Sequence, residues 1–233
     1  MIGLQSLPQI ITAIGGLGTA AFGIVDATKV FGGGANHIGF KGIRAAVTQL
    51  TPPAAAGAGQ PVNALSQQKI LATLQANWFN GTDLGNQKSI AKALIKLNLN
   101  AGNAPALAAA TGVDPGALTA VATSIANGTP LTSPQSDVFA RFDLILTALL
   151  DEAYQRSDQV YRNGTRALAM VTSVVLALVG GVILHNAGTD PRWGLDIAEA
   201  LLVGLLATPL APIAKDLSTA LATAVNTLQV VKK

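Results

Sequence analysis

The sequence predicts an all-α integral membrane protein with about three transmembrane helices and a cytoplasmic helical domain. Three observations support this fold class. Half of the 233 residues are hydrophobic and only 12% are charged, against about 25% in soluble domains. The range 167–184 is almost wholly apolar and long enough to cross a bilayer. The breaks between apolar segments are helix caps, and no β-branched alternation indicates a strand.

Residues 1–31 are predicted to contain the first transmembrane helix. No charged residue occurs in 1–25, and 7–25 offers roughly one crossing of the ~30 Å hydrocarbon core. Small residues in membrane helices let two backbones approach closely. We therefore expect a tight helix–helix contact, within or between subunits, through Gly16, Ala20 and Gly23. Asp26 and Lys29 follow and are expected to form an ion pair at the interface.

Residues 32–61 are predicted to hold a surface helix and a linker. The helix, Asn36–Leu50, is amphipathic and carries Lys41 and Arg44. This pattern fits a segment lying on anionic lipid and equally fits an ordinary packed helix. The linker 51–61 (TPPAAAGAGQP) is rich in Pro, Ala and Gly, and we place a domain boundary there.

Residues 62–132 are predicted to form a cytoplasmic helical subdomain. The expected helices cover 62–79, 86–97, 105–110 and 115–127. The second of them carries a basic stripe at i, i+4 spacing through Lys88, Lys92 and Lys96.

One long helix is predicted over 133–186, beginning at Ser133 before a proline. It is amphipathic and charged as far as Arg166, and apolar afterwards. At about 1.5 Å per residue such a helix approaches 80 Å. Phe142, Ile145 and Leu149 lie at seam spacing, so this helix pairs within the chain or forms a homo-oligomeric stalk. We favour an oligomer seam.

A third, kinked span is predicted over 187–214, followed by an amphipathic helix over 215–233 with a seam of its own. Pro209 is expected to kink this span. The alternative is that the segment does not cross the membrane and is re-entrant or interfacial. Asp196 and Glu199 lie three residues apart at its start. They form an ion path or cap the first helical turn, where the helix dipole favours carboxylates.

Basic residues predict the orientation in the membrane. The segment between the first and second spans holds ten of them, and the region before the first span holds none. The positive-inside rule therefore places the N-terminus outside, and the helical domain and the C-terminus in the cytoplasm.

The residue inventory argues against catalysis, cofactors and metals. There is no cysteine, and the proposed topology separates the two histidines, His37 and His185, across the membrane. The stretch PALAAATGVDPGALTAV, residues 105–121, resembles a helix-turn-helix. Its second helix has no Lys or Arg to meet phosphate, so we expect no binding of nucleic acid.

The segments GGLGTAAFGIVDATKVFGGG (15–34) and LLVGLLATPLAPIAKDLSTAL (201–221) resemble a set of small bacterial inner-membrane proteins with the same order of span, helical domain and two spans. The resemblance implies the bacterial inner membrane and no particular chemistry. The two helix seams and the glycine face of the first span lead us to expect a homo-oligomeric scaffold, or an accessory subunit bound to other membrane subunits. The alternative is an oligomeric channel with Asp196 and Glu199 near its mouth.

Overall fold

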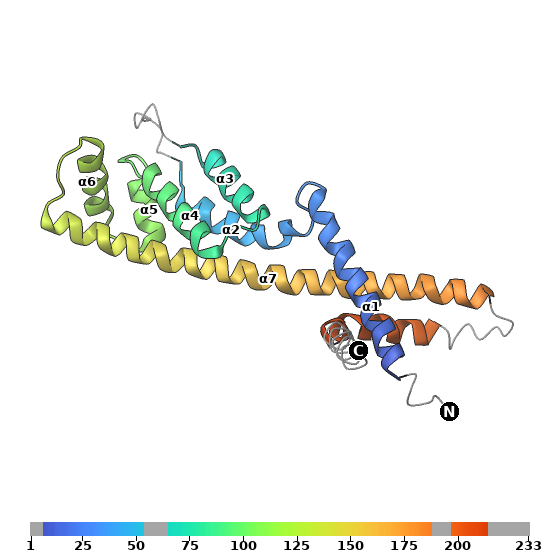
Figure 1. Cartoon of the computed structure of the whole chain (residues 1–233). Helices are drawn as coiled ribbons and strands as arrows, with labels where there is room; N and C mark the ends of the chain where they lie inside the picture. The colour runs from blue at the N-terminus through green and yellow to red at the C-terminus, as the bar shows by residue number, and fades with distance from the viewer. Residues whose placement is uncertain (1–6, 54–64, 188–196, 214–233) are drawn as a thin grey trace, which may run out of the picture. The chain divides into compact units, whose positions relative to one another are not determined.

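A computed structural model gives the fold of residues 7–53, 65–187 and 197–213. All regular structure in these residues is helical, which confirms the predicted all-α class. Figure 1 shows the labelled elements. They are α1 (Leu7–Ala27), the 3-10 turn η1 (Thr28–Val30), α2 (Asn36–Leu50), α3 (Gln67–Phe79), α4 (Leu84–Asn98), α5 (Ala104–Thr111), α6 (Pro115–Ala126) and α7 (Ser133–Ala187). An unlabelled helix, Ile197–Ile213, follows.

Side-chain caps define where several helices begin. Helix α3 begins at Gln67 rather than at Val62, because the Ser66 hydroxyl accepts a hydrogen bond from a backbone N–H of its first turn. Asp83 and Asp114 cap α4 and α6 in the same way. Each of these caps satisfies a backbone donor that has no partner inside the helix.

Helix α7 begins at Ser133 as predicted, but the capping residue is Thr132. The Thr132 backbone N–H donates to Gln135 Oε1 at 2.9 Å, and the Gln135 N–H donates back to the Thr132 hydroxyl at 3.5 Å. This reciprocal pair is a capping box. From there α7 continues without interruption to Ala187.

The chain divides into two compact units, one of which is residues 36–161, here called the helical domain. Helices α2 to α6 and the first part of α7 build one hydrophobic core. Phe40, Ile43 and Val47 of α2 are buried in it. Of the two alternatives predicted for α2, the structure therefore shows the ordinary packed helix. The linker 51–61 joins two helices of one unit, so the domain boundary predicted there is wrong. Residues 54–64 lie outside the described residues.

The helix-turn-helix spacing does produce two packed helices. Helices α5 and α6 contact each other. Gly112 ends α5 in the left-handed conformation, at φ 66°, which glycine adopts without steric cost. Leu107, Leu118 and Val121 from the two helices are buried.

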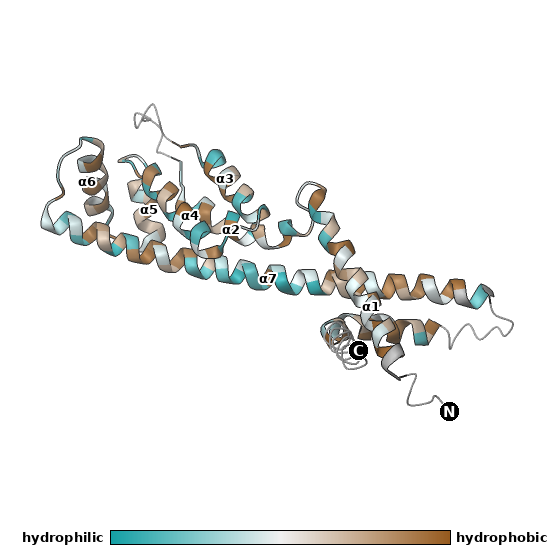
Figure 2. Cartoon of the chain, in the orientation of Figure 1, coloured by the Kyte–Doolittle hydropathy of each residue, from teal (hydrophilic) through white to brown (hydrophobic). Residues whose placement is uncertain are grey.

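The second unit, here called the apolar bundle, contains the described residues up to Ala35 and from Arg162 onward. Figure 2 shows α7 changing from mixed colours to predominantly hydrophobic ones in this part. Within the described ranges, two helices are long and apolar enough to cross a membrane, within Ile10–Val30 and Ser133–Ile183, and Ile197–Ile213 is shorter. The predicted helix over 215–233 lies outside the described residues.

Candidate functional site

Three helices of the apolar bundle meet through glycine. A Cβ placed on Gly18 of α1 would lie 2.0 Å from the carbonyl oxygen of Ala207. A Cβ on Gly204 would lie 2.6 Å from Val174 Cα in α7. Only glycine allows such approaches, because any side chain would have to displace the neighbouring backbone. The helix Ile197–Ile213 is therefore held closely against both α1 and α7.

A buried hydroxyl pair joins two of these helices. Ser173 Oγ of α7 lies 2.7 Å from the Gly204 carbonyl oxygen and 2.8 Å from that of Met170, which are alternative acceptors for its proton. Thr208 Oγ1 lies 3.3 Å away, and both hydroxyl side chains are buried. Hydrogen bonds of this type between helices are a recurrent contact in membrane proteins.

The apolar bundle places small residues inside and large ones outside. Among its described residues, the buried positions apart from Val25 are small: Gly15, Gly18, Ala21, Gly33, Ala35, Ala169, Ser173, Ala177, Ala200, Gly204, Ala207, Thr208 and Ala211. Its exposed positions include Val171, Val175, Val179, Ile183, Leu202, Leu205, Leu206 and Ile213. A water-soluble bundle buries its large apolar side chains, so this arrangement is suited to a surrounding of lipid.

The predicted contact residues of α1 lie on the opposite face from the observed contact. Gly16, Ala20 and Gly23 are exposed, and a Cβ on Gly16 or Gly23 would meet nothing within 4 Å among the described residues. The contact inside the chain uses Gly18 and its helical neighbours instead. The sequence did carry this signal, because Gly15, Gly18 and Ala21 recur on one helical face. A contact of the Gly16 face with another subunit stays a prediction.

The predicted ion path is only partly described. Glu199 is exposed in the first described turn of Ile197–Ile213, and Asp196 lies outside the described residues. Three hydroxyl side chains of α7 in the apolar bundle, those of Thr165, Thr172 and Ser173, bond to backbone carbonyls. Thr172 Oγ1 donates to Leu168 at 2.9 Å and Thr165 Oγ1 to Arg162 at 3.0 Å, while Ser173 bonds within the bundle as described above.

The predicted oligomer seam of α7 faces the chain's own core. Phe142 is fully buried among residues of the helical domain. Ile145 and Leu149 are half-buried and pack against the same core. The seam is therefore filled by neighbouring helices of the same chain, the intramolecular alternative of the two predicted.

The lysine stripe of α4 pairs with carboxylates on α7. Lys92 and Lys96 both bind Asp143, at 3.1 and 3.0 Å, and Lys88 binds Asp151. The hydrogen bond from Lys96, opposed by partial burial and reinforced by Lys92, holds the pKa of Asp143 below its ordinary value. The pairing of this stripe with a later helix was not predicted from the sequence, although the two carboxylates repeat the eight-residue spacing of Lys88 and Lys96.

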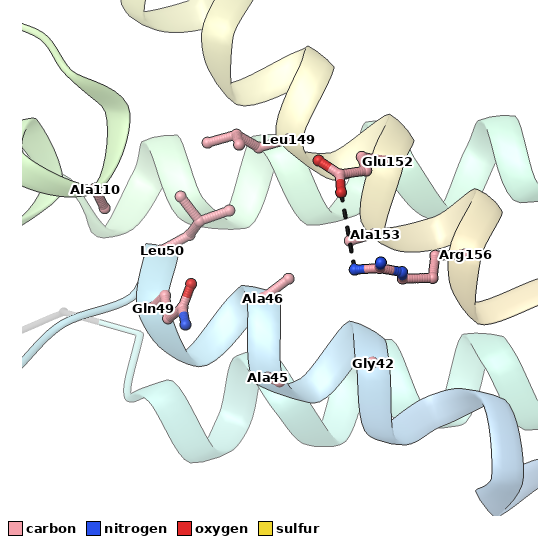
Figure 3. A pocket seen from close by; sticks show the side chains of 10 residues that line it. All are labelled: Gly42, Ala45, Ala46, Gln49, Leu50, Ala110, Leu149, Glu152, Ala153 and Arg156. Carbon is pink, nitrogen blue, oxygen red and sulfur yellow. Dashed lines mark ion pairs between the residues drawn. The ribbon is translucent and has the colours of Figure 1, made fainter. Parts of the chain in front are cut away.

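A groove of about 380 Å³ lies between α2, α5 and α7 of the helical domain. Figure 3 shows small side chains on its walls and the Glu152–Arg156 ion pair, 4.0 Å long, at one side. Both charged side chains are more than two-thirds exposed, so their carboxylate and guanidinium remain in contact with water. The lining is Gly42, Ala45, Ala46, Gln49, Leu50, Ala110, Leu149, Glu152, Ala153 and Arg156. Such a groove can accept an apolar ridge, and its lining contains no nucleophile paired with a base.

Among the described residues, no group of three or more His, Cys, Asp and Glu side chains could hold a metal ion. Comparisons with models of protein families, with curated proteins and with solved structures found no match to this chain.

Proposed function

We propose that this protein is a structural component of the bacterial inner membrane. In this proposal α1, the apolar part of α7 and the helix Ile197–Ile213 cross the bilayer, with the N-terminus outside and the helical domain in the cytoplasm. One observation carries the proposal: the apolar bundle buries glycine, alanine and hydroxyl side chains and exposes valine, leucine and isoleucine. Lipid tails solvate those large side chains at no cost, so packing of small residues drives association instead.

The third crossing rests on the contacts of Ile197–Ile213. This helix of 17 residues is about 25 Å long, slightly short of the ~30 Å core. A short helix can cross where it is enclosed by longer ones or where the bilayer thins locally. The close contacts at Gly18 and Gly204 support its inclusion with α1 and α7.

We infer that the protein acts as a homo-oligomeric scaffold or as an accessory subunit of a membrane complex, without catalysis. The open face of Gly16, Ala20 and Gly23 supports this role, because it repeats on the outside the small-residue pattern that α1 uses inside. The channel alternative receives less support, since the hydroxyls of Thr165, Thr172 and Ser173 are already bonded to backbone carbonyls.

The test is the mass of the full chain in nanodiscs, measured for the wild type, Gly16→Leu and Gly180→Leu. We expect a wild-type oligomer that Gly16→Leu reduces to monomers, because the leucine would hold two copies of α1 apart. Gly180→Leu is the matched control, since a Cβ there also meets nothing within 4 Å in the described part of the chain, and we expect it to keep the wild-type mass.

Each other result bears on a separate part of the proposal. A monomeric wild type would contradict homo-oligomerisation. An oligomer unchanged by Gly16→Leu would place the contact on another face. A ring with a central opening that conducts ions, with conduction reduced by Glu199→Gln, would favour the channel.

A further inference from the structure

The loop after α1 exposes two large apolar side chains next to each other. Val30 is 84% exposed and Phe31 is 81% exposed. These are the highest exposures of large hydrophobic residues among the described parts of the chain. Single exposed apolar residues are common on proteins, but an adjacent valine and phenylalanine at the tip of an ordered loop call for a partner.

The loop is held in a defined shape that presents this tip. Thr28 Oγ1 donates to the Val25 carbonyl at 2.6 Å and accepts from the Ala35 N–H at 3.3 Å. The glycines that follow Phe31 all have positive φ, which side chains rarely adopt. A Cβ on Gly34 would also lie 2.2 Å from the Thr28 carbonyl oxygen. The chain thus reverses tightly around Thr28 and leaves Val30 and Phe31 pointing outward.

The place of the tip along the chain indicates what covers it. The candidate span Ile10–Val30 has 21 residues, or about 31 Å of helix, so its end falls at the border of the hydrocarbon core. The ion pair of Asp26 and Lys29, 2.5 Å long, would then lie just inside this border, from where the long lysine side chain reaches toward the headgroups. Aromatic and large apolar side chains beside a basic residue are the usual composition of segments that enter this border zone.

We propose that Val30 and Phe31 form a membrane wedge: the two side chains insert into the boundary between lipid headgroups and acyl chains, on the side where α1 ends. The inference rests on the proposed function, because it requires α1 to cross the bilayer. Insertion of about 5–10 Å is typical for such side chains. The wedge would set the depth and rotation of α1 at the point where the chain leaves the membrane for α2.

The experiment measures the depth of a single spin label in the full chain reconstituted in nanodiscs. The protein has no cysteine, so Phe31→Cys carries one nitroxide without further changes. Collisions with oxygen, which concentrates in lipid, are compared with collisions with a water-soluble nickel chelate. Two matched controls use other exposed apolar positions: Val175→Cys on the apolar part of α7, 53% exposed, and Leu97→Cys on α4, 72% exposed.

We expect the label at position 175 to collide mainly with oxygen and the label at position 97 mainly with nickel. The label at position 31 should fall between them, on the lipid side of the headgroups, with its collisions with nickel reduced several-fold relative to position 97. Nickel accessibility at position 31 equal to that at position 97 would overturn the wedge while leaving the crossing of α7 intact. Protection of position 31 from both reagents would also overturn it, because protein would then cover the tip.

Failure of the proposed function gives a different pattern. If position 175 is as accessible to nickel as position 97, the apolar bundle does not lie in lipid. This result would contradict both the membrane wedge and the proposed function.

Discussion

At the scale of single residues, the surroundings of each glycine show whether helix packing requires a glycine at that position. Gly18 and Gly204 lie where a Cβ would collide with a neighbouring backbone, whereas Gly16 and Gly180 face open space. All four occur in helical segments rich in alanine and in large aliphatic residues, and composition does not distinguish them. What differs is the helix that lies against each one.

Gly204→Ala is expected to destabilise the apolar bundle by about 1–3 kcal/mol, the usual cost of forcing an extra methyl into a tight contact. The added Cβ would lie 2.6 Å from Val174 Cα, so α7 and Ile197–Ile213 must move apart. Thermal unfolding in a mild detergent measures the effect. Gly180→Ala, with open space around the Cβ, should leave stability unchanged or raise it by about 0.5–1 kcal/mol through lower backbone entropy. Equal Tm values for the two variants would contradict the close contact.

At the scale of elements, pairing of charges aligns α4 with α7. Lys88 binds Asp151 while Lys96 binds Asp143, so the two helices run antiparallel. Lys96 Nζ also lies 4.6 Å from the ring centroid of Phe139, a distance that favours a cation–π interaction. The pairs lie beside a core that includes Ala91 and Leu146, and they fix the register in which these apolar faces meet.

Asp143→Asn is expected to lower the stability of the helical domain by about 1 kcal/mol at neutral pH, as for partly exposed ion pairs. Its effect should depend on pH. The pKa of Asp143 is lowered in the folded state, so the pairs stabilise above the unfolded pKa of about 3.9 and this contribution is lost as pH falls through the folded pKa. The difference between wild type and variant should therefore vanish in acid.

Urea unfolding between pH 7 and strongly acidic pH tests this dependence. Trp78, which is buried in the helical domain, reports unfolding by fluorescence in a Trp193→Phe background. Glu152→Gln serves as control: its pair with Arg156 lies within one helix and is mostly exposed, so a change below about 0.5 kcal/mol is expected. A constant effect of Asp143→Asn across all pH values would show that the ion pairs are not its cause.

At the scale of the whole molecule, the chain combines two kinds of packing. The helical domain buries large side chains such as Phe142 and Tyr154, as soluble proteins do. Burial also raises the pKa of Tyr154, since the phenolate would lose hydration. The apolar bundle does the reverse, with small residues inside. One continuous helix, α7, belongs to both units.

Residues 36–161 expressed alone are expected to form a soluble, monomeric helical domain. The reason is that every residue of the main hydrophobic core lies within this range. Circular dichroism should give a helical spectrum and a single cooperative thermal transition, and light scattering should give the monomer mass. Aggregation or a broad, non-cooperative transition would indicate that the domain needs the apolar bundle to fold.

By itself, the sequence determined the helical elements and the two apolar segments long enough to cross a membrane. Caps, prolines and apolar runs act within a few residues, so Asn36–Leu50, the capped helix after Asp114 and the start at Ser133 could be predicted from local chemistry. The ion pair of Asp26 and Lys29 was predictable for the same reason, because it joins residues three apart.

Only the tertiary structure decided which face of each helix is used. Gly18 rather than Gly16 contacts another helix, Phe142 enters the chain's own core, and the lysines of α4 meet α7. The glycine contact and the lysine pairs each join residues more than forty positions apart. Several faces of α1 and α7 satisfy the same small or apolar pattern, and the choice among them depends on the shape of a partner that local sequence does not encode.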